Sequence, residues 1–107
     1  MVDKESEDNI MQLQLLEQNI QNFLMQKQQF QVQLSEVESA LENLKDAKKA
    51  YKIVANIMID AKKDALEAEL KQKKEVLELR IKNLEKQEEK IREKSQKLQK
   101  EVLGKME

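Results

Sequence analysis

The first half of the chain carries apolar residues at alternating spacings of three and four. Two columns result, with Leu13, Ile20, Lys27, Leu34 and Leu41 in one and Leu16, Phe23, Phe30, Val37 and Leu44 in the other. They match the a and d positions of a heptad repeat, which predicts a coiled-coil helix over about residues 7–46. Lys27 is the polar member. We expect its stem to lie along the seam while its amine reaches a Glu.

The second half shows a weaker repeat of the same kind. Leu70, Leu77, Leu84, Ile91 and Leu98 recur at intervals of seven, beside a mixed column of Glu67, Lys74, Ile81, Glu88, Ser95 and Val102. This pattern predicts a second coiled-coil helix over about residues 62–103, and Gly104 lies where a helix would stop. The polar members weaken this side of the seam without breaking it.

Residues 50–60 follow a different period. Apolar residues alternate with their neighbours at a spacing of two, which predicts short strands around Tyr51–Val54 and Ile57–Asp60. Ala55 and Asn56 then form the tight turn of a β-hairpin. Asn tolerates positive φ but Ala does not, so a longer loop or one bent strand remains open.

A chain reversal at Ala55 and Asn56 would bring the two helices together in phase. Leu13 comes level with Leu98, and Ile20 with Ile91. The first 60 residues carry more acidic than basic side chains and the remainder the reverse, so the halves attract each other. We therefore predict a mainly α fold, a long antiparallel two-helix coiled-coil hairpin with a short β-hairpin at the connection, in one domain spanning residues 1–107.

The predicted strands are strongly apolar. Alternation along the chain assigns Tyr51, Ile53, Ile57 and Ile59 to one face, with Val54 and Met58 adding apolar surface to the other. An isolated two-stranded hairpin is only marginally stable in water, and its edges are unpaired. We therefore predict that it joins hairpins of other subunits. The interface residues would be Tyr51, Ile53, Val54, Ile57, Met58 and Ile59.

Composition narrows the classes of function. More than half of the chain is Ala, Glu, Lys, Leu and Arg, as in long helices. The chain contains neither Cys nor His, so thiolate chemistry is excluded, and paired carboxylates such as Glu88 and Glu89 are expected on a solvated helix face. Its one Gly provides no phosphate loop. We predict no enzyme activity and no cofactor or metal.

The net charge and hydropathy of the chain indicate whether it binds nucleic acid or membranes. The net charge of −1 does not suit binding to duplex nucleic acid, and no apolar run is long enough to span a bilayer. Neither helix has the basic face and aromatic edge of a membrane-surface helix. We expect a cytoplasmic protein that binds neither nucleic acid nor membrane.

Three stretches carry a family resemblance over nearly the whole chain. They read QNFLMQKQQFQVQLSEVESAL in the first helix, AYKIVANIMI in the centre and ELKQKKEVLELRIKNLEKQEEKI in the second helix. In these stretches the chain resembles prefoldin, and in particular its β-type subunit, which has one β-hairpin between its helices. Family members commonly have Gly where this chain has Ala55.

The resemblance implies an ATP-independent chaperone, a holdase. It implies a hetero-hexamer with an α-type subunit, built on the joined hairpins. Non-native client proteins would be captured at the coiled-coil tips and passed to a group II chaperonin. Whether the chain also forms a homo-oligomer when alone is left open.

The predicted client-binding tip is formed by both ends of the chain. Ile10, Met11, Leu15, Leu103 and Met106 fall outside the seam columns, and Leu13, Leu98 and Val102 end the seam. Flexible Met and Leu side chains suit a surface that accepts many apolar partners. The competing interpretation is that these are scattered surface residues. For the whole chain, the competing function is a structural coiled-coil scaffold or oligomerisation module without chaperone activity.

Overall fold

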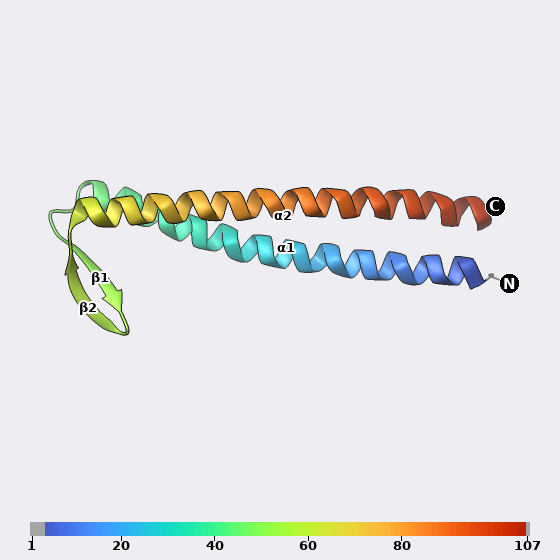
Figure 1. The fold of residues 1–107 in the computed structure, drawn as a ribbon, viewed down its shortest axis with the longest axis horizontal. Coiled ribbons are helices and arrows are strands. Elements are labelled where there is room, and N and C mark those ends of the chain that lie inside the picture. The colour runs from blue at the N-terminus through green and yellow to red at the C-terminus, as the bar shows by residue number, and fades with distance from the viewer. Residues whose placement is uncertain (1–3, 107) are drawn as a thin grey trace. The chain divides into compact units, whose positions relative to one another are not determined.

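The computed structural model describes residues 4–106, and the side chains of residues 4–104. Helix α1 (Lys4–Lys45) is followed by strands β1 (Ala50–Val54) and β2 (Ile57–Ala61) and by helix α2 (Lys63–Met106) (Figure 1). This element order confirms the predicted fold class, two long helices with a short antiparallel β-hairpin between them. Helix α2 continues through Gly104, where the sequence suggested an end.

Helix ends carry charges that suit the helix dipole. Glu5 and Glu7 lie in the first turn of α1 and Asp64 in that of α2, where carboxylates face the positive pole. At the other end of α1, Lys63 Nζ donates a hydrogen bond of 2.8 Å to the carbonyl oxygen of Lys45. This bond satisfies one of the carbonyl groups that a helix end leaves without a partner.

The chain divides into two compact units. Unit 1 comprises residues 1–28 and 82–107, and unit 2 comprises residues 29–81.

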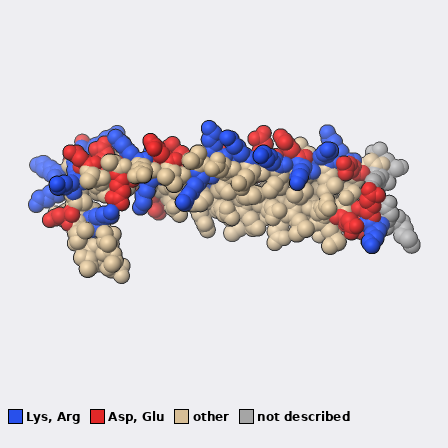
Figure 2. Space-filling view, viewed as in Figure 1, with Lys and Arg blue, Asp and Glu red and all other residues tan. Residues whose placement is uncertain are grey.

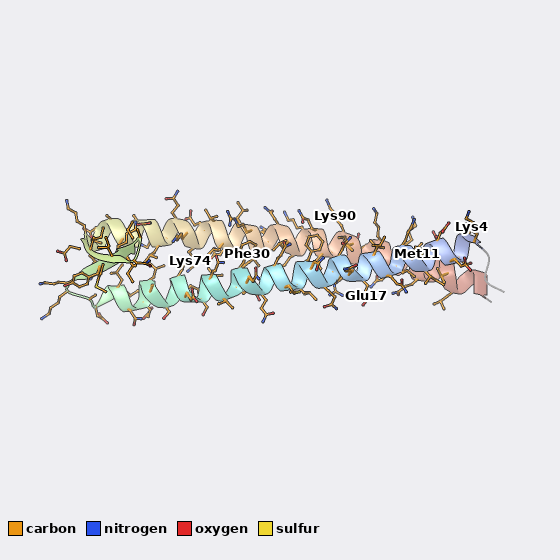
Figure 3. All side chains as sticks on the ribbon, turned by 90° about the horizontal axis from the view of Figure 1, so that it is seen from below. Lys4, Met11, Glu17, Phe30, Lys74 and Lys90 are labelled. Carbon is orange, nitrogen blue, oxygen red and sulfur yellow. The ribbon has the colours of Figure 1, made fainter. Side chains whose placement is uncertain are left out.

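Unit 2 packs the second part of α1 against the first part of α2 in antiparallel fashion. Leu44, Leu77 and Ile81 are buried, and the seam residues Leu34, Val37 and Leu41 are half-buried. The guanidinium carbon of Arg80 lies 5.6 Å from the ring centroid of Phe30, a cation–π distance. Figure 3 shows Phe30 beside α2. The predicted heptad columns are thus the residues that pack.

The β-hairpin of unit 2 has the predicted register. Ala50 pairs with Ala61 and Val54 with Ile57, so each strand is one residue longer than expected at its outer end. Ala55 and Asn56 form the turn with φ values of 50° and 66°, and positive φ at both central residues is typical of a type I′ turn. The longer loop and the single bent strand are therefore wrong.

Ala55 holds a backbone conformation that an L-residue with a Cβ disfavours. We expect Ala55→Gly to stabilise the hairpin by about 0.5–1 kcal/mol, since Gly relieves the strain but loses more entropy on folding. Amide hydrogen exchange in β1 and β2 would measure the change. Ala68→Gly in α2 is the control and should instead speed exchange in the helix. Faster exchange in the hairpin of the Ala55→Gly protein would contradict the argument.

Unit 1 packs the first part of α1 against the last part of α2. Leu84 and Val102 are buried here together with the polar residues Glu88 and Ser95, so the expectation of a solvated position was wrong for Glu88. Lys27 Nζ lies 3.5 Å from Glu85 Oε1, which confirms the expected reach of this seam lysine to a Glu. Arg92 Nε donates a hydrogen bond of 2.9 Å to Glu88 Oε1, and Arg92 Nη2 lies 2.8 Å from the same oxygen. The buried carboxylate is therefore paired.

Candidate functional site

Two surfaces of the described chain expose groups of apolar side chains. One is the β-hairpin of unit 2. The other is the end of unit 1, where the early turns of α1 meet the late turns of α2. We call these the hairpin surface and the end surface.

The hairpin surface consists of the six residues predicted as an interface. Their exposed fractions run from 46% to 69%, for Tyr51, Ile53, Val54, Ile57, Met58 and Ile59. In Figure 2 no charged atoms cover the turn end of this hairpin, whereas charged side chains surround its base. Large apolar side chains gathered at such exposure on one element mark an interaction surface.

The two faces of the hairpin differ from the expected distribution. Ile53 lies opposite Met58 across the strands, so Tyr51, Ile53 and Met58 share one face. Val54 lies opposite Ile57, and these two share the other face with Ile59. The expectation of one mainly apolar face was wrong, because a two-residue turn pairs odd-numbered with even-numbered positions. Both faces are apolar, so an assembly that buries this hairpin must cover both.

An ion pair ties the hairpin to α2. Lys52 Nζ lies 2.9 Å from Glu69 Oε1 and 3.0 Å from Oε2, with both side chains partly exposed. The hydrogen bond from Lys52 and then its positive charge lower the pKa of Glu69, and the charge of Lys73 adds to this against a small opposing effect of burial. The pair holds the root of the hairpin surface against the helix.

We expect Lys52→Gln to raise the pKa of Glu69 toward its ordinary value, because the main cause of the lowering is removed. Since the folded-state pKa is lowered, the stabilisation by this pair is present above the unfolded-state pKa. It is lost as the pH falls through the folded-state pKa. A carboxyl NMR titration of Glu69 would measure the shift. Lys71→Gln is the control, because Lys71 pairs with Glu67 at 3.0 Å and not with Glu69.

The end surface contains some of the predicted tip residues and not others. Met11, Leu15 and Leu103 are exposed by 62%, 60% and 63%. Ile10, Leu13 and Leu98 are half-buried, and Val102 is buried in the seam, where it supports the surface without forming it. The side chain of Met106 lies outside the described residues.

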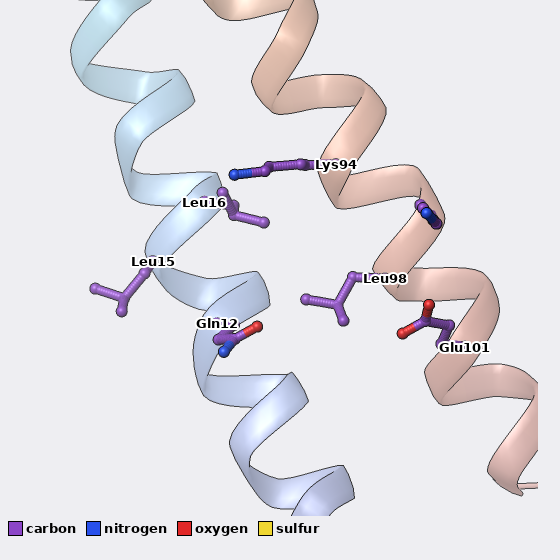
Figure 4. A pocket seen from close by; sticks show the side chains of 7 residues that line it. Gln12, Leu15, Leu16, Lys94, Leu98 and Glu101 are labelled. Atoms are coloured by element: carbon purple, nitrogen blue, oxygen red, sulfur yellow. The ribbon is translucent and has the colours of Figure 1, made fainter.

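Sequence reasoning missed several residues of the end surface. A groove there is lined by Gln12, Leu15, Leu16, Lys94, Lys97, Leu98 and Glu101, of which only Leu15 and Leu98 were predicted to be functional (Figure 4). No pattern in the sequence singles out the other five, because the groove depends on which residues of α1 and α2 lie side by side.

Acidic groups do not gather into a metal site in residues 4–104. No cluster of three or more carboxylates there has the geometry to hold an ion. None of the described helices has an apolar stretch long enough to cross a membrane.

Comparisons with known proteins agree on one family. A family model described as prefoldin subunit matches residues 7–107. The chain is 44% identical over 87 residues to prefoldin subunit beta of Archaeoglobus fulgidus, covering 78% of this chain and 75% of that protein. It is 34% identical over 104 residues to prefoldin subunit beta of Methanospirillum hungatei, covering 94% and 87%.

A solved structure gives the same result. The crystal structure of the prefoldin beta subunit from Thermococcus strain KS-1 matches with a TM-score of 0.92 and 32% sequence identity. The match covers 97% of this chain and 94% of that one. These findings confirm the resemblance drawn from the sequence.

Proposed function

Because this chain belongs to the prefoldin family, we propose that it is a subunit of an ATP-independent chaperone that holds unfolded proteins. The observation that carries the proposal is the exposure of Met11, Leu15 and Leu103 at the end surface. Side chains of this kind bind exposed apolar segments of many sequences, because Met and Leu adapt their shape to different partners.

Capture by such a surface depends on many weak contacts. The strongly exposed apolar side chains of the end surface are few, so one copy would hold a client weakly. Several copies in one assembly raise the effective concentration and so the overall affinity. An oligomer is therefore part of the proposed mechanism.

The hairpin surface is the proposed means of assembly. Two unpaired strand edges and two apolar faces suit insertion between the hairpins of other subunits. We propose an α-type prefoldin subunit as the partner in a hetero-hexamer, and a group II chaperonin as the recipient of the client. Catalysis has no part in this proposal, since binding and release of a client require no chemical step.

The test is prevention of aggregation without nucleotide. An unfolded protein is diluted into buffer containing the chain assembled with an α-type subunit, and light scattering is followed. We expect scattering to fall as the chaperone concentration rises, with no effect of added ATP. Unchanged scattering at excess chaperone would reject the proposal and favour a structural scaffold.

A further inference from the structure

The groove on the end surface has an apolar floor. It lies between α1 and α2 within unit 1 and has a volume of about 530 Å³. Leu16 and Leu98 extend toward each other across the space between the helices (Figure 4). Leu15 lies at its outer margin. A space of this size admits large apolar side chains from another chain.

The floor of the groove is formed by seam residues, since Leu16 and Leu98 both belong to the heptad columns. Ser95 is a buried member of the mixed seam column of α2, in which the other heptads place Glu67, Lys74, Ile81, Glu88 and Val102. Ser95 lines a separate hollow, together with Ile20 and Leu24 among others, and not the groove itself. A hollow of about 450 Å³ also lies in unit 2 beside the seam residues Val37 and Leu77, so the groove differs from it in its lining rather than in its size.

The margin of the groove is positively charged. Lys94 and Lys97 both line it, and Lys94 reaches from α2 toward Leu16 (Figure 4). In the described part of the chain neither lysine forms an ion pair, unlike Lys27, which is paired with Glu85. Glu101 is the one acidic residue that lines the groove. The net positive charge of these side chains therefore favours a ligand with a negatively charged group beside the apolar floor.

We infer that this groove selects unfolded segments in which a large apolar residue lies next to Asp or Glu. The apolar side chain would enter between Leu16 and Leu98, and the carboxylate would accept hydrogen bonds from Lys94 and Lys97. The inference rests on the proposed function and adds a preference to it. Because both lysines are exposed, the preference is modest and weakens as salt is added.

The test uses three fluorescent peptides with the same Phe and Leu core, flanked by Asp, Asn or Lys. Binding to the assembled oligomer is measured by fluorescence anisotropy at low salt. We expect the Asp-flanked peptide to bind about three- to tenfold more tightly than the Asn-flanked one, as two exposed ion pairs allow. The Lys-flanked peptide should bind least tightly.

Matched variants locate the preference. Lys94→Gln with Lys97→Gln should remove it while leaving the Asn-flanked peptide bound as before. Lys86→Gln with Lys90→Gln is the control, since it removes the same charge from the same helix outside the groove. Figure 3 shows Lys90 projecting away from α1. The inference is overturned if the Lys94→Gln, Lys97→Gln protein still prefers the Asp-flanked peptide. It is also overturned if the control protein loses this preference equally.

Other outcomes separate the inference from the proposed function. Equal binding of all three peptides, together with prevention of aggregation, rejects the charge preference alone. Failure to bind any peptide or to prevent aggregation rejects the proposed function. A change in oligomer mass in the Lys94→Gln, Lys97→Gln protein would show that the groove is an interface between copies, and would overturn the inference as well.

Discussion

Ile53→Asp combined with Met58→Asp is expected to abolish assembly of the oligomer while leaving the helices folded. The two residues lie opposite each other on one face of the hairpin and are exposed in the single chain. Burying each side chain contributes about 1.5–3 kcal/mol, so their loss weakens each interface by at least a hundredfold. Two carboxylates without partners would add a desolvation penalty. Sedimentation with an α-type subunit should show mainly free chains.

The control places the same change elsewhere on the surface. Val32→Asp with Leu79→Asp alters two exposed apolar residues of α1 and α2 in unit 2, outside the hairpin. We expect this protein to assemble like the wild type. Circular dichroism would establish that helix content is retained in both proteins. Full assembly of the Ile53→Asp, Met58→Asp protein would show that the hairpin surface is not the assembly element.

The packing of the helices was predictable because a heptad repeat is visible within one helix, and its a and d positions face the partner helix. Positions such as Leu77 and Ile81 recur at three and four, and they are the buried ones. The turn was predictable for a similar reason, since the change from a heptad to a period of two marks the strands. The register then followed from the midpoint at Ala55 and Asn56.

The candidate sites were less predictable, because they depend on which residues face each other across elements. Alternation along one strand does not reveal that Met58 shares a face with Ile53; the turn length decides this. The groove depends on which residues of α1 and α2 lie side by side, and a repeat within one helix does not show this. Lys94 and Lys97 looked like ordinary solvated charges in the sequence. Only their position beside Leu16 and Leu98 distinguishes them from Lys86 and Lys90.

Met11→Gln combined with Leu15→Gln is expected to remove most client capture without affecting assembly. Both side chains are exposed by about 60%, so their replacement leaves the seam intact. Each loses up to about 1–2 kcal/mol of apolar contact with a client, and the losses multiply over the copies that hold it. We expect at least a tenfold higher chaperone concentration to be needed for half-maximal prevention of aggregation.

The chain offers a closely matched control for this pair. Met25 and Leu79 are exposed by 62% and 59%, against 62% and 60% for Met11 and Leu15, and neither lies on the end surface. Met25→Gln with Leu79→Gln therefore removes the same side chains at the same exposure. If capture depends on location, this control protein should prevent aggregation as well as the wild type. If both double variants lose capture equally, clients bind wherever apolar side chains are exposed. The end surface would then have no special role, and the charge preference of its groove would have no client to act on.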